Sequence, residues 1–276
     1  MSKQLVITKR ENQIISSLFI EKELVQINCE EQSEKNILGN IYVGKVKNIV
    51  KNINAAFIEI KDKQMCFLSL DDCREPLFCN GKKSGTIHIG DMLLVQISKE
   101  GVKTKVPTVT CNLSLTGKYG VVTYGKKQLG ISTKITDKEE RERLLKILKE
   151  NPLNSLGCII RTNAASVADD IILREITQLQ ETFDIIEKQG IYRSCFSMVH
   201  EAPSGFLCHI RDGYSDEIDE ILTDEKDIFD CIYFYLEQNQ KSDLGKLKYY
   251  QDPLVSLNCL YSIERQLEKA MQKKYG

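Results

Sequence analysis

The 276-residue sequence lacks the features that would place it in a membrane or among secreted, disulfide-linked proteins. Residues 1–10 contain no apolar core of a signal peptide, and no later run approaches the roughly 18 apolar residues of a membrane span. The ten cysteines are scattered without a CxxC pair, and the three histidines cannot easily supply the missing ligands of a zinc site. We therefore expect a cytoplasmic location, reduced thiols and no metal bound by cysteine.

Motifs of catalytic machinery are missing as well. The sequence contains no glycine-rich phosphate loop, and His209 beside Cys208 has no acid at the spacing that a nucleophile and its base need. The carboxylates between Asp216 and Asp224 would suit Mg²⁺ in a residual nuclease site, but such a cluster is also typical of a solvated surface. We therefore assign no catalytic residue and no metal ligand.

The chain has enough apolar residues, 42%, for two or three compact units, and it contains no low-complexity tract. Its net charge is only −1, but the charge is unevenly distributed. Seven lysines and one glutamate lie between Ser98 and Ile135, whereas ten carboxylates face two basic residues between His200 and Asp230. The first stretch attracts phosphate groups and the second repels them. Charge alone leaves two interpretations open, a phosphate-binding surface or two solvated faces of opposite sign.

The first 115 residues have the pattern of β-strands. Apolar residues at strand spacing predict strands over 3–28, split by a polar turn at 10–12. Short strands separated by glycine and polar turns then run from residue 40 to about 115, with a turn at 51–54. Five strands in about 75 residues is the size of an OB-fold, so we predict a small barrel here.

From residue 136 onward the apolar spacing changes to that of helices. A capping box at Thr136–Glu139 predicts a helix that ends at 151–152, a strand follows at 156–160, and Ser166 opens the longest helix, ended by Gly190. This helix carries an apolar stripe that favours packing against a sheet: Ile172, Ile176, Leu179, Phe183 and Ile186. The rest alternates strand and helix, at 218–222, 225–239, 246–251 and 256–274. The whole pattern predicts a mixed α/β (α+β) protein.

Two phenylalanines in the predicted barrel are candidates for a base-stacking platform. Phe57 has the opposite strand parity to Ala56 and Ile58, so it faces outward if those two face the core, and Phe67 lies on the neighbouring strand. Exposed aromatic rings on a barrel stack on unpaired bases, although core packing is the other interpretation of either residue. Lys105, in a basic loop, would neutralise a backbone phosphate or remain a solvated charge.

Arg161 and Thr162 form the sharpest candidate pair. They follow an apolar strand and precede the predicted cap of the longest helix, which would fix a guanidinium and a hydroxyl at a rigid edge. A guanidinium fork and a hydroxyl suit a terminal phosphate. The alternative is an ordinary turn at the end of a strand, with Arg161 paired to a carboxylate such as Asp169 or Asp170.

Several ordered stretches resemble the ribonuclease E/G family over essentially the whole chain. They match in order and at compatible spacing, and they are residues 39–46 (GNIYVGKV), 54–58 (NAAFI), 113–119 (LSLTGKY), 130–132 (GIS), 160–162 (IRT), 210–212 (IRD) and 252–254 (DPL). Agreement of seven ordered motifs is much more specific than any one of them.

The resemblance implies a discontinuous RNase H-like domain, an inserted OB-fold (S1) barrel and an α/β 5′-sensor region. The RNase H-like domain would comprise residues 1–38 and 192–276, the S1 domain 39–116 and the sensor region 117–191. Phe57, Phe67 and Lys105 match the family's RNA-binding positions. The positions that hold the 5′-monophosphate of RNA in the family match Gly117, Val121, Arg161 and Thr162.

The resemblance also sets limits on function. In the family the chain continues into a DNase I-like domain with Mg²⁺-binding aspartates and then a zinc-sharing cysteine pair, whereas this sequence stops at Gly276. We therefore expect no cofactor in this chain, which would bind single-stranded RNA, preferably 5′-monophosphorylated, without cutting it. Thr133 and Lys134 stand where the family usually has two arginines, so the pocket is less cationic. The alternative is a regulatory or protein-interaction module that docks a partner through acidic residues 200–230.

Overall fold

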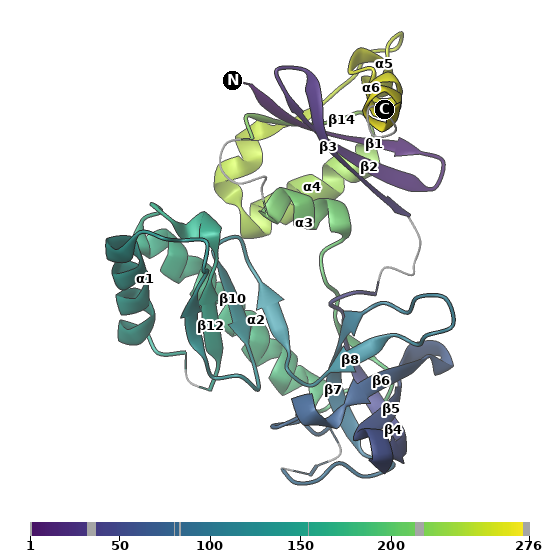
Figure 1. Ribbon diagram of the computed structural model, residues 1–276, viewed down its shortest axis with the longest axis vertical. Helices are drawn as coiled ribbons and strands as arrows, with labels where there is room; N and C mark the ends of the chain where they lie inside the picture. The colour runs from purple at the N-terminus through teal and green to yellow at the C-terminus, as the bar shows by residue number, and fades with distance from the viewer. Residues whose placement is uncertain are drawn as a thin grey trace. The chain divides into compact units, whose positions relative to one another are not determined.

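The computed structural model describes residues 2–31, 37–79, 81–82, 84–153, 155–212 and 218–272. The chain divides into two compact units, one formed by Met1–Asn36 with Pro203–Gly276 and the other by Ile37–Ala202. Three sheets and several helices give the mixed α/β architecture that the sequence predicts (Figure 1). Both ends of the chain contribute to the first unit, so the second unit is an insertion between them.

The first unit contains a five-stranded sheet in the order β15-β14-β1-β2-β3. Strands β1, β2 and β3 pair antiparallel, while β14 pairs with β1 and β15 with β14, both in parallel. The elements are β1 (Lys3–Arg10), β2 (Gln13–Ile20), β3 (Glu23–Glu31), α3 (Gly205–Asp212), β14 (Glu220–Thr223), α4 (Lys226–Asn239), β15 (Leu247–Tyr249), α5 (Leu257–Leu260) and α6 (Ile263–Gln272).

Strand β1 is buried on both faces. Leu5 and Ile7 belong to the core that α3 and α4 complete, whereas Val6 belongs to a separate core with Phe19 and residues of α5 and α6. Successive residues of a strand point to opposite sides of a sheet, so a sheet covered on both faces needs a continuous apolar run in its central strand. The run from Leu5 to Ile7 meets that need, and all three side chains are fully buried.

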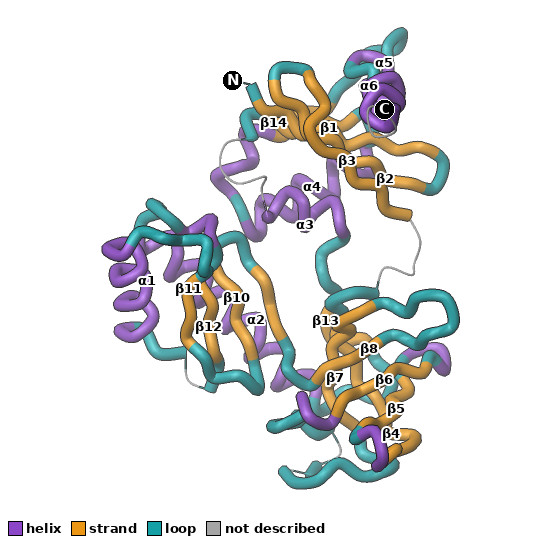
Figure 2. Tube along the Cα trace, in the orientation of Figure 1, coloured by secondary structure: helices purple, strands orange, loops and turns teal. Residues whose placement is uncertain are grey.

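The second unit begins with a closed five-stranded barrel, which confirms the predicted OB-like fold (Figure 2). Strand β4 pairs with β5 on one side and with β7 on the other, and β6 and β8 complete the circuit. The interior is filled by residues of alternate parity such as Ala56, Ile58 and Leu68. The strands are β4 (Ile41–Val50), β5 (Ala55–Glu59), β6 (Met65–Ser69), β7 (Met92–Lys99) and β8 (Thr108–Thr110), and β13 (Met198–His200) adds to β4 from outside the circuit.

A four-stranded sheet, in the order β11-β12-β10-β9, follows the barrel. Helix α2 packs against β10 and β9 through the predicted apolar stripe, of which Ile172, Ile176, Phe183 and Ile186 are buried. The barrel and this sheet share one core, because Ile41 of the barrel clusters with residues of the sheet and its helices. The elements are β9 (Ser114–Thr116), β10 (Gly120–Thr123), β11 (Leu129–Ile131), α1 (Lys138–Glu150), β12 (Gly157–Ile160) and α2 (Asp169–Gly190).

Three predicted helix limits are wrong. Asp137 caps α1, accepting a hydrogen bond from the Glu140 N–H at 2.8 Å, so Thr136 is not the cap. Helix α2 starts at Asp169, because Ser166 has a positive φ of 61° that a helix does not admit. The predicted helix at 256–274 is two helices, α5 and α6, separated at Ser262, where φ is 47°. None of the helices in the described ranges is long and apolar enough to cross a membrane.

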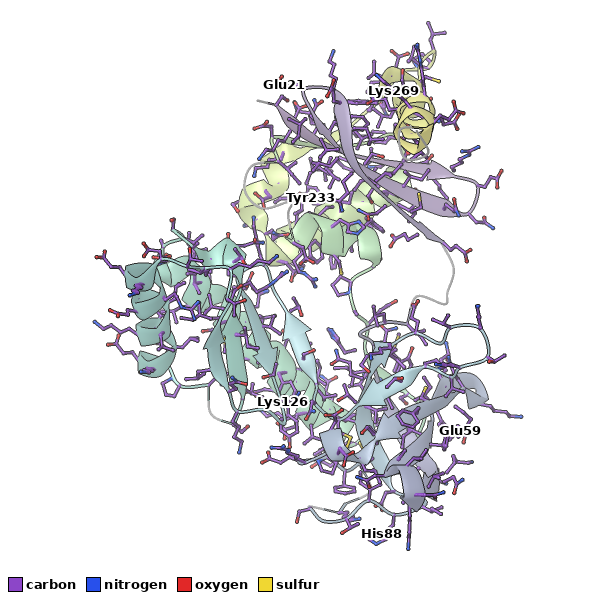
Figure 3. The ribbon with its side chains drawn as sticks, in the orientation of Figure 1. Glu21, Glu59, His88, Lys126, Tyr233 and Lys269 are labelled. Carbon is purple, nitrogen blue, oxygen red and sulfur yellow. A yellow bond between two sulfur atoms is a disulfide. The ribbon has the colours of Figure 1, made fainter. Side chains whose placement is uncertain are left out.

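The prediction that all ten cysteines are reduced is also wrong. Cys73 and Cys111 form a disulfide with a Cα–Cα distance of 5.3 Å, and the other eight cysteines are free (Figure 3). Cys73 lies just beyond β6 and Cys111 just beyond β8, two strands that pair in parallel. The disulfide therefore links neighbouring strand ends of the barrel, which their sequence separation of 38 residues does not reveal.

We expect this disulfide to stabilise the oxidised protein. Closing a 38-residue loop removes unfolded-state entropy worth about 3–4 kcal/mol in the chain-entropy model. Urea unfolding with and without dithiothreitol measures the difference. Thiol titration of the unfolded, unreduced protein should count eight free thiols, and a count of ten together with an unchanged unfolding midpoint would contradict the assignment.

Candidate functional site

The predicted stacking phenylalanines lie side by side on the outside of the barrel. Phe57 on β5 and Phe67 on β6 are directly paired across the two strands, with ring centroids 6.2 Å apart in an edge-to-face arrangement. Both are half-buried, whereas their strand neighbours Ile58 and Cys66 are fully buried in the barrel. The parity argument from the sequence therefore places the ring of Phe57 correctly on the outer face of the barrel, and Phe67 lies beside it on the neighbouring strand, as predicted.

The loop that carries Lys105 is attached to the edge of this aromatic pair. The Phe67 N–H donates to the Pro107 carbonyl at 2.8 Å, and Phe67 is the register partner of Thr108 on β8. Lys105 is exposed, and its N–H donates to the Val102 carbonyl, which makes the loop a tight turn. Lys105 is thus two residues from Pro107, whose carbonyl accepts the hydrogen bond from Phe67.

On the other side of the pair, polar groups continue the same outer face. Phe57 is paired with Asn48 of β4, so Asn48, Phe57, Phe67 and Thr108 form one row across four strands. Glu59, labelled on the barrel in Figure 3, is neutralised by Lys47 at 2.8 Å. An anionic ligand therefore meets a face whose nearby carboxylate is already paired.

Arg161 closes a tight turn between β9 and β10. It follows β12, and its Nη1 donates to the Gly117 carbonyl at 2.7 Å while its backbone N–H donates to the Tyr119 carbonyl at 2.7 Å. The turn is closed a second time by the Gly117 N–H, which donates to Gly120 O at 2.8 Å. Two of the predicted phosphate-binding residues, Gly117 and Arg161, are thus in direct contact although 44 residues separate them.

The same turn is bound by a half-buried carboxylate that sequence reasoning missed. Glu175 of α2 accepts hydrogen bonds from the N–H groups of Lys118, Tyr119 and Gly120 at 2.8, 2.7 and 3.0 Å. Burial raises the pKa of Glu175 above its usual value, and the three N–H donors and the charge of Arg161 oppose that rise. A Cβ atom added at Gly117 would overlap Glu175 Oε1, which explains why this position needs glycine.

Thr162 belongs to a second cluster at the ends of β11 and β12. Its hydroxyl lies 3.0 Å from the hydroxyl of Ser132, which also accepts a hydrogen bond from the Lys134 N–H at 3.3 Å. Arg141 of α1 donates through Nη1 to the Ser132 carbonyl at 2.8 Å and to Ile135 O at 2.9 Å. Arg141 thus brings a cation from α1 to Ser132. Ser132 precedes Thr133 and Lys134, which stand where the resemblance leads us to expect two arginines.

Val121 borders the turn without entering the core. It is half-buried on β10, where its register partners are Thr116 of β9 and Ile159 of β12. The N–H of its neighbour Gly120 donates to Glu175, so Val121 directly follows the turn that this carboxylate binds. Of the four residues predicted to hold a phosphate, Gly117 lies in the turn between β9 and β10, Val121 on β10, and Arg161 and Thr162 directly after β12. Arg161 contacts Gly117, whereas Thr162 contacts Ser132.

An ion-pair network fixes the segment that follows Thr162. Arg143 of α1 bonds both oxygens of Glu140, at 2.9 and 2.7 Å, and Glu140 also accepts the Ser166 N–H at 2.8 Å. These bonds lower the pKa of Glu140 to about 2. Arg143 also pairs with Asp169, and Asp170 pairs with Arg174. The two carboxylates that we considered as partners of Arg161 therefore have arginine partners of their own.

The acidic stretch offers little as a metal site in the part that is described. Asp216 and Glu217 lie outside the described residues. Among the residues that the structure does describe, no group of three or more His, Cys, Asp or Glu side chains is placed to hold a metal ion. Asp219 accepts the Lys3 N–H at 2.8 Å, and Asp224 accepts the Leu257 N–H at 3.1 Å, so both have structural bonds.

The chain is similar to known proteins over most of its length. The family model described as "Ribonuclease E/G family" matches residues 114–276. Ribonuclease E of Synechocystis sp. is 30% identical over 230 residues, which are 81% of this chain and 33% of the relative. Ribonuclease G of Escherichia coli strain K12 is 25% identical over 264 residues, 91% of this chain and 53% of the relative. A ribonuclease E/G-like protein of Porphyra purpurea is 28% identical over 262 residues, 92% of this chain and 50% of the relative. This chain spans between a third and about half of the length of these relatives.

Proposed function

The chain belongs to the ribonuclease E/G family, and we propose that residues 1–276 bind single-stranded RNA and sense a 5′-monophosphate at its end. In this proposal Phe57, Phe67 and Lys105 contact the RNA chain. Arg161 and Thr162 contact the terminal phosphate, with Gly117 and Val121 forming the wall of the pocket. In this proposal the partner is RNA, and the protein takes part in RNA processing in the cytoplasm.

The observation that carries the proposal is the outward-facing, half-buried aromatic pair on the closed barrel. Apolar rings usually face the core, but Phe57 and Phe67 both lie on the outer face, beside the loop of Lys105. Outward-facing rings on an OB-like barrel are suited to stack on unpaired bases, and a lysine in the adjoining loop is suited to neutralise the RNA backbone.

The architecture supports the finer division into named regions. The closed barrel fits an S1 domain, and the four-stranded sheet with α1 and α2 fits the 5′-sensor region. The five-stranded sheet built from both ends of the chain fits the RNase H-like domain. We place this domain at 1–38 and 192–276, the S1 domain at 39–116 and the sensor region at 117–191, although the compact unit itself comprises Met1–Asn36 and Pro203–Gly276 and β13 pairs with the barrel.

We assign no catalytic residue, cofactor or metal to this chain. The proposal rests on binding groups alone, and the metal-capable side chains of the described ranges form no cluster of three or more. Relatives named as ribonucleases are two to three times as long as the matched part, and for these 276 residues we propose the binding role alone. The chain is thus proposed as the RNA-binding, non-catalytic half of such a protein.

The proposal is tested by comparing two oligonucleotides that differ only at the 5′ end. We expect a fluorescent single-stranded RNA with a 5′-monophosphate to bind about tenfold more tightly than its 5′-hydroxyl form, as charge-assisted hydrogen bonds provide. The affinity of both should fall with rising salt. Equal affinities would refute the phosphate site, and an absence of salt-dependent binding would refute RNA binding altogether.

A protein-interaction module remains a second candidate, motivated by the acidic residues of 200–230. Four of the eight described carboxylates there have ion-pair partners, which weakens an electrostatic docking face: Asp212 pairs with Arg211, Glu220 with Lys248, Asp227 with Lys9 and Asp230 with Lys226. Two results together would favour this candidate over the first proposal. The wild type would co-purify with a protein partner that an Asp227→Asn/Asp230→Asn variant fails to retain, and the wild type would show no affinity for RNA.

A further inference from the structure

We propose that Glu175 is the positioning residue of the 5′-phosphate site, acting through the turn 117–120 to aim the guanidinium of Arg161. The inference rests on the proposed function and adds a residue that no predicted motif contains. Glu175 makes no contact with the RNA in this proposal. Its carboxylate holds the turn, the turn holds Arg161, and Arg161 holds the phosphate.

The first step is the hold of Glu175 on the turn. Its two oxygens accept three consecutive N–H groups, Oε2 that of Lys118 and Oε1 those of Tyr119 and Gly120, at 2.7 to 3.0 Å. Consecutive backbone N–H groups that point to one spot make an anion cradle. A carboxylate accepting such bonds is charge-assisted and makes them roughly twice as strong as neutral ones. The turn is therefore fixed by a helix that lies outside the turn itself.

The second step leads from the turn to Arg161. The N–H groups of the turn point to Glu175, whereas two of its carbonyls, those of Gly117 and Tyr119, accept from Arg161 at 2.7 Å each. The Gly117 carbonyl receives the guanidinium itself, so the direction of that carbonyl sets the direction of the fork. If the turn lost its hold on Glu175, the Gly117 carbonyl would be free to rotate and Arg161 would lose its orientation.

The third step concerns where a phosphate can bind. The N–H cradle at 118–120 would itself suit a phosphate, but an internal carboxylate already occupies it. A terminal phosphate is therefore directed to the guanidinium of Arg161 and to the hydroxyl of Thr162, which follows it in the chain and adjoins Ser132. Glycine at 117 belongs to the same arrangement, because any Cβ there would displace Glu175 Oε1.

The test compares Glu175→Gln with Glu181→Gln, which removes the same charge from an exposed position on the same helix. A glutamine turns an N–H₂ group toward N–H donors, so the cradle is no longer satisfied. We expect the preference for 5′-monophosphate over 5′-hydroxyl RNA to fall about tenfold in Glu175→Gln, with 5′-hydroxyl affinity unchanged, and Glu181→Gln to match the wild type. Glu175→Asp keeps the negative charge but shortens the side chain by one methylene group. It replaces Glu175→Gln in the same comparison if the glutamine variant is too unstable.

A double variant separates positioning from general damage. If Glu175 acts only through Arg161, then Arg161→Ala/Glu175→Gln shows no more loss of preference than Arg161→Ala alone. Additive losses would overturn the positioning role. So would a Glu175→Gln variant that keeps the wild-type preference, and that second result would leave the proposed function intact.

An NMR readout keeps the inference testable if RNA discrimination fails. In the wild type, the Arg161 side-chain N–H resonance should be protected from solvent exchange, and Glu175→Gln should abolish that protection while Glu181→Gln retains it. A wild type that does not distinguish the two RNAs refutes the proposed function. An Arg161 resonance that Glu175→Gln leaves unchanged refutes the positioning link, whichever RNA result is obtained.

Discussion

Arg161→Ala should abolish most of the preference for 5′-monophosphorylated RNA, with a loss of about 10- to 100-fold in affinity for that RNA and little change for the 5′-hydroxyl form. Hydrogen bonds to charged groups contribute about 1.5–3 kcal/mol each, which corresponds to this range. The guanidinium is already oriented by the Gly117 carbonyl, so a bound phosphate gains from it without first paying the entropy of ordering the side chain. Titration of the two oligonucleotides by fluorescence anisotropy measures the effect.

Arg174→Ala is the matched control for this prediction. Arg174 is an exposed arginine of α2 that pairs with Asp170 at 3.7 Å, and its removal changes the net charge equally. We expect this control to keep the wild-type preference for the 5′-monophosphate. An equal loss in both variants would mean that the effect is one of overall charge, and Arg161 would then have no special role.

Phe57→Ala and Phe67→Ala should each weaken binding of single-stranded RNA about 5- to 100-fold, whatever its 5′ end. Stacking of one base on an aromatic ring is worth about 1–3 kcal/mol by alanine substitution. Because the rings are in contact, with centroids 6.2 Å apart, we expect the double variant to lose less than the sum of the single losses. The measurement is the affinity for a short unstructured RNA at fixed salt concentration.

Phe234→Ala provides the control for the aromatic pair. Phe234 is 65% exposed on α4, so its removal also deletes an exposed ring but outside the barrel. The affinity of the Phe234→Ala variant for RNA should equal that of the wild type. If Phe57→Ala and Phe67→Ala retain full affinity while thermal melting shows them folded, the stacking role is excluded and the pair is a packing feature of the barrel surface.

The sequence predicts the strands and their faces well because the apolar spacing is a local property. The parity of Phe57 against Ala56 and Ile58 is enough to place its ring outside, and the stripe from Ile172 to Ile186 is enough to place α2 against a sheet. Helix starts fail where two patterns overlap or a distant contact decides. Thr136–Glu139 and Asp137–Glu140 are capping patterns one residue apart, and only the second receives the helix N–H.

The candidate site is less predictable because its contacts join distant segments. Ser166 does not begin the helix because its φ is 61°, and its N–H donates to Glu140 of another helix, 26 residues away. Glu175 lies between the buried residues Ile172 and Ile176, and a single acid at the edge of an apolar stripe has the same sequence signature as a solvated one. The pairing of Cys73 with Cys111 likewise depends on the register of β6 with β8.

The construction of the first unit from both ends of the chain has a consequence for the order of events during synthesis. Strand β1 needs β14 as its parallel neighbour, and 216 residues separate Lys3 from Asp219, whose side chain accepts the Lys3 N–H. The hairpins of the amino-terminal strands must therefore wait, partly uncovered, until the ribosome has released residues beyond 220. The inserted unit, Ile37–Ala202, is compact by itself and can fold during that wait. A barrel folded early would leave nascent apolar strands such as β1 and β2 as the exposed segment that chaperones have most reason to protect.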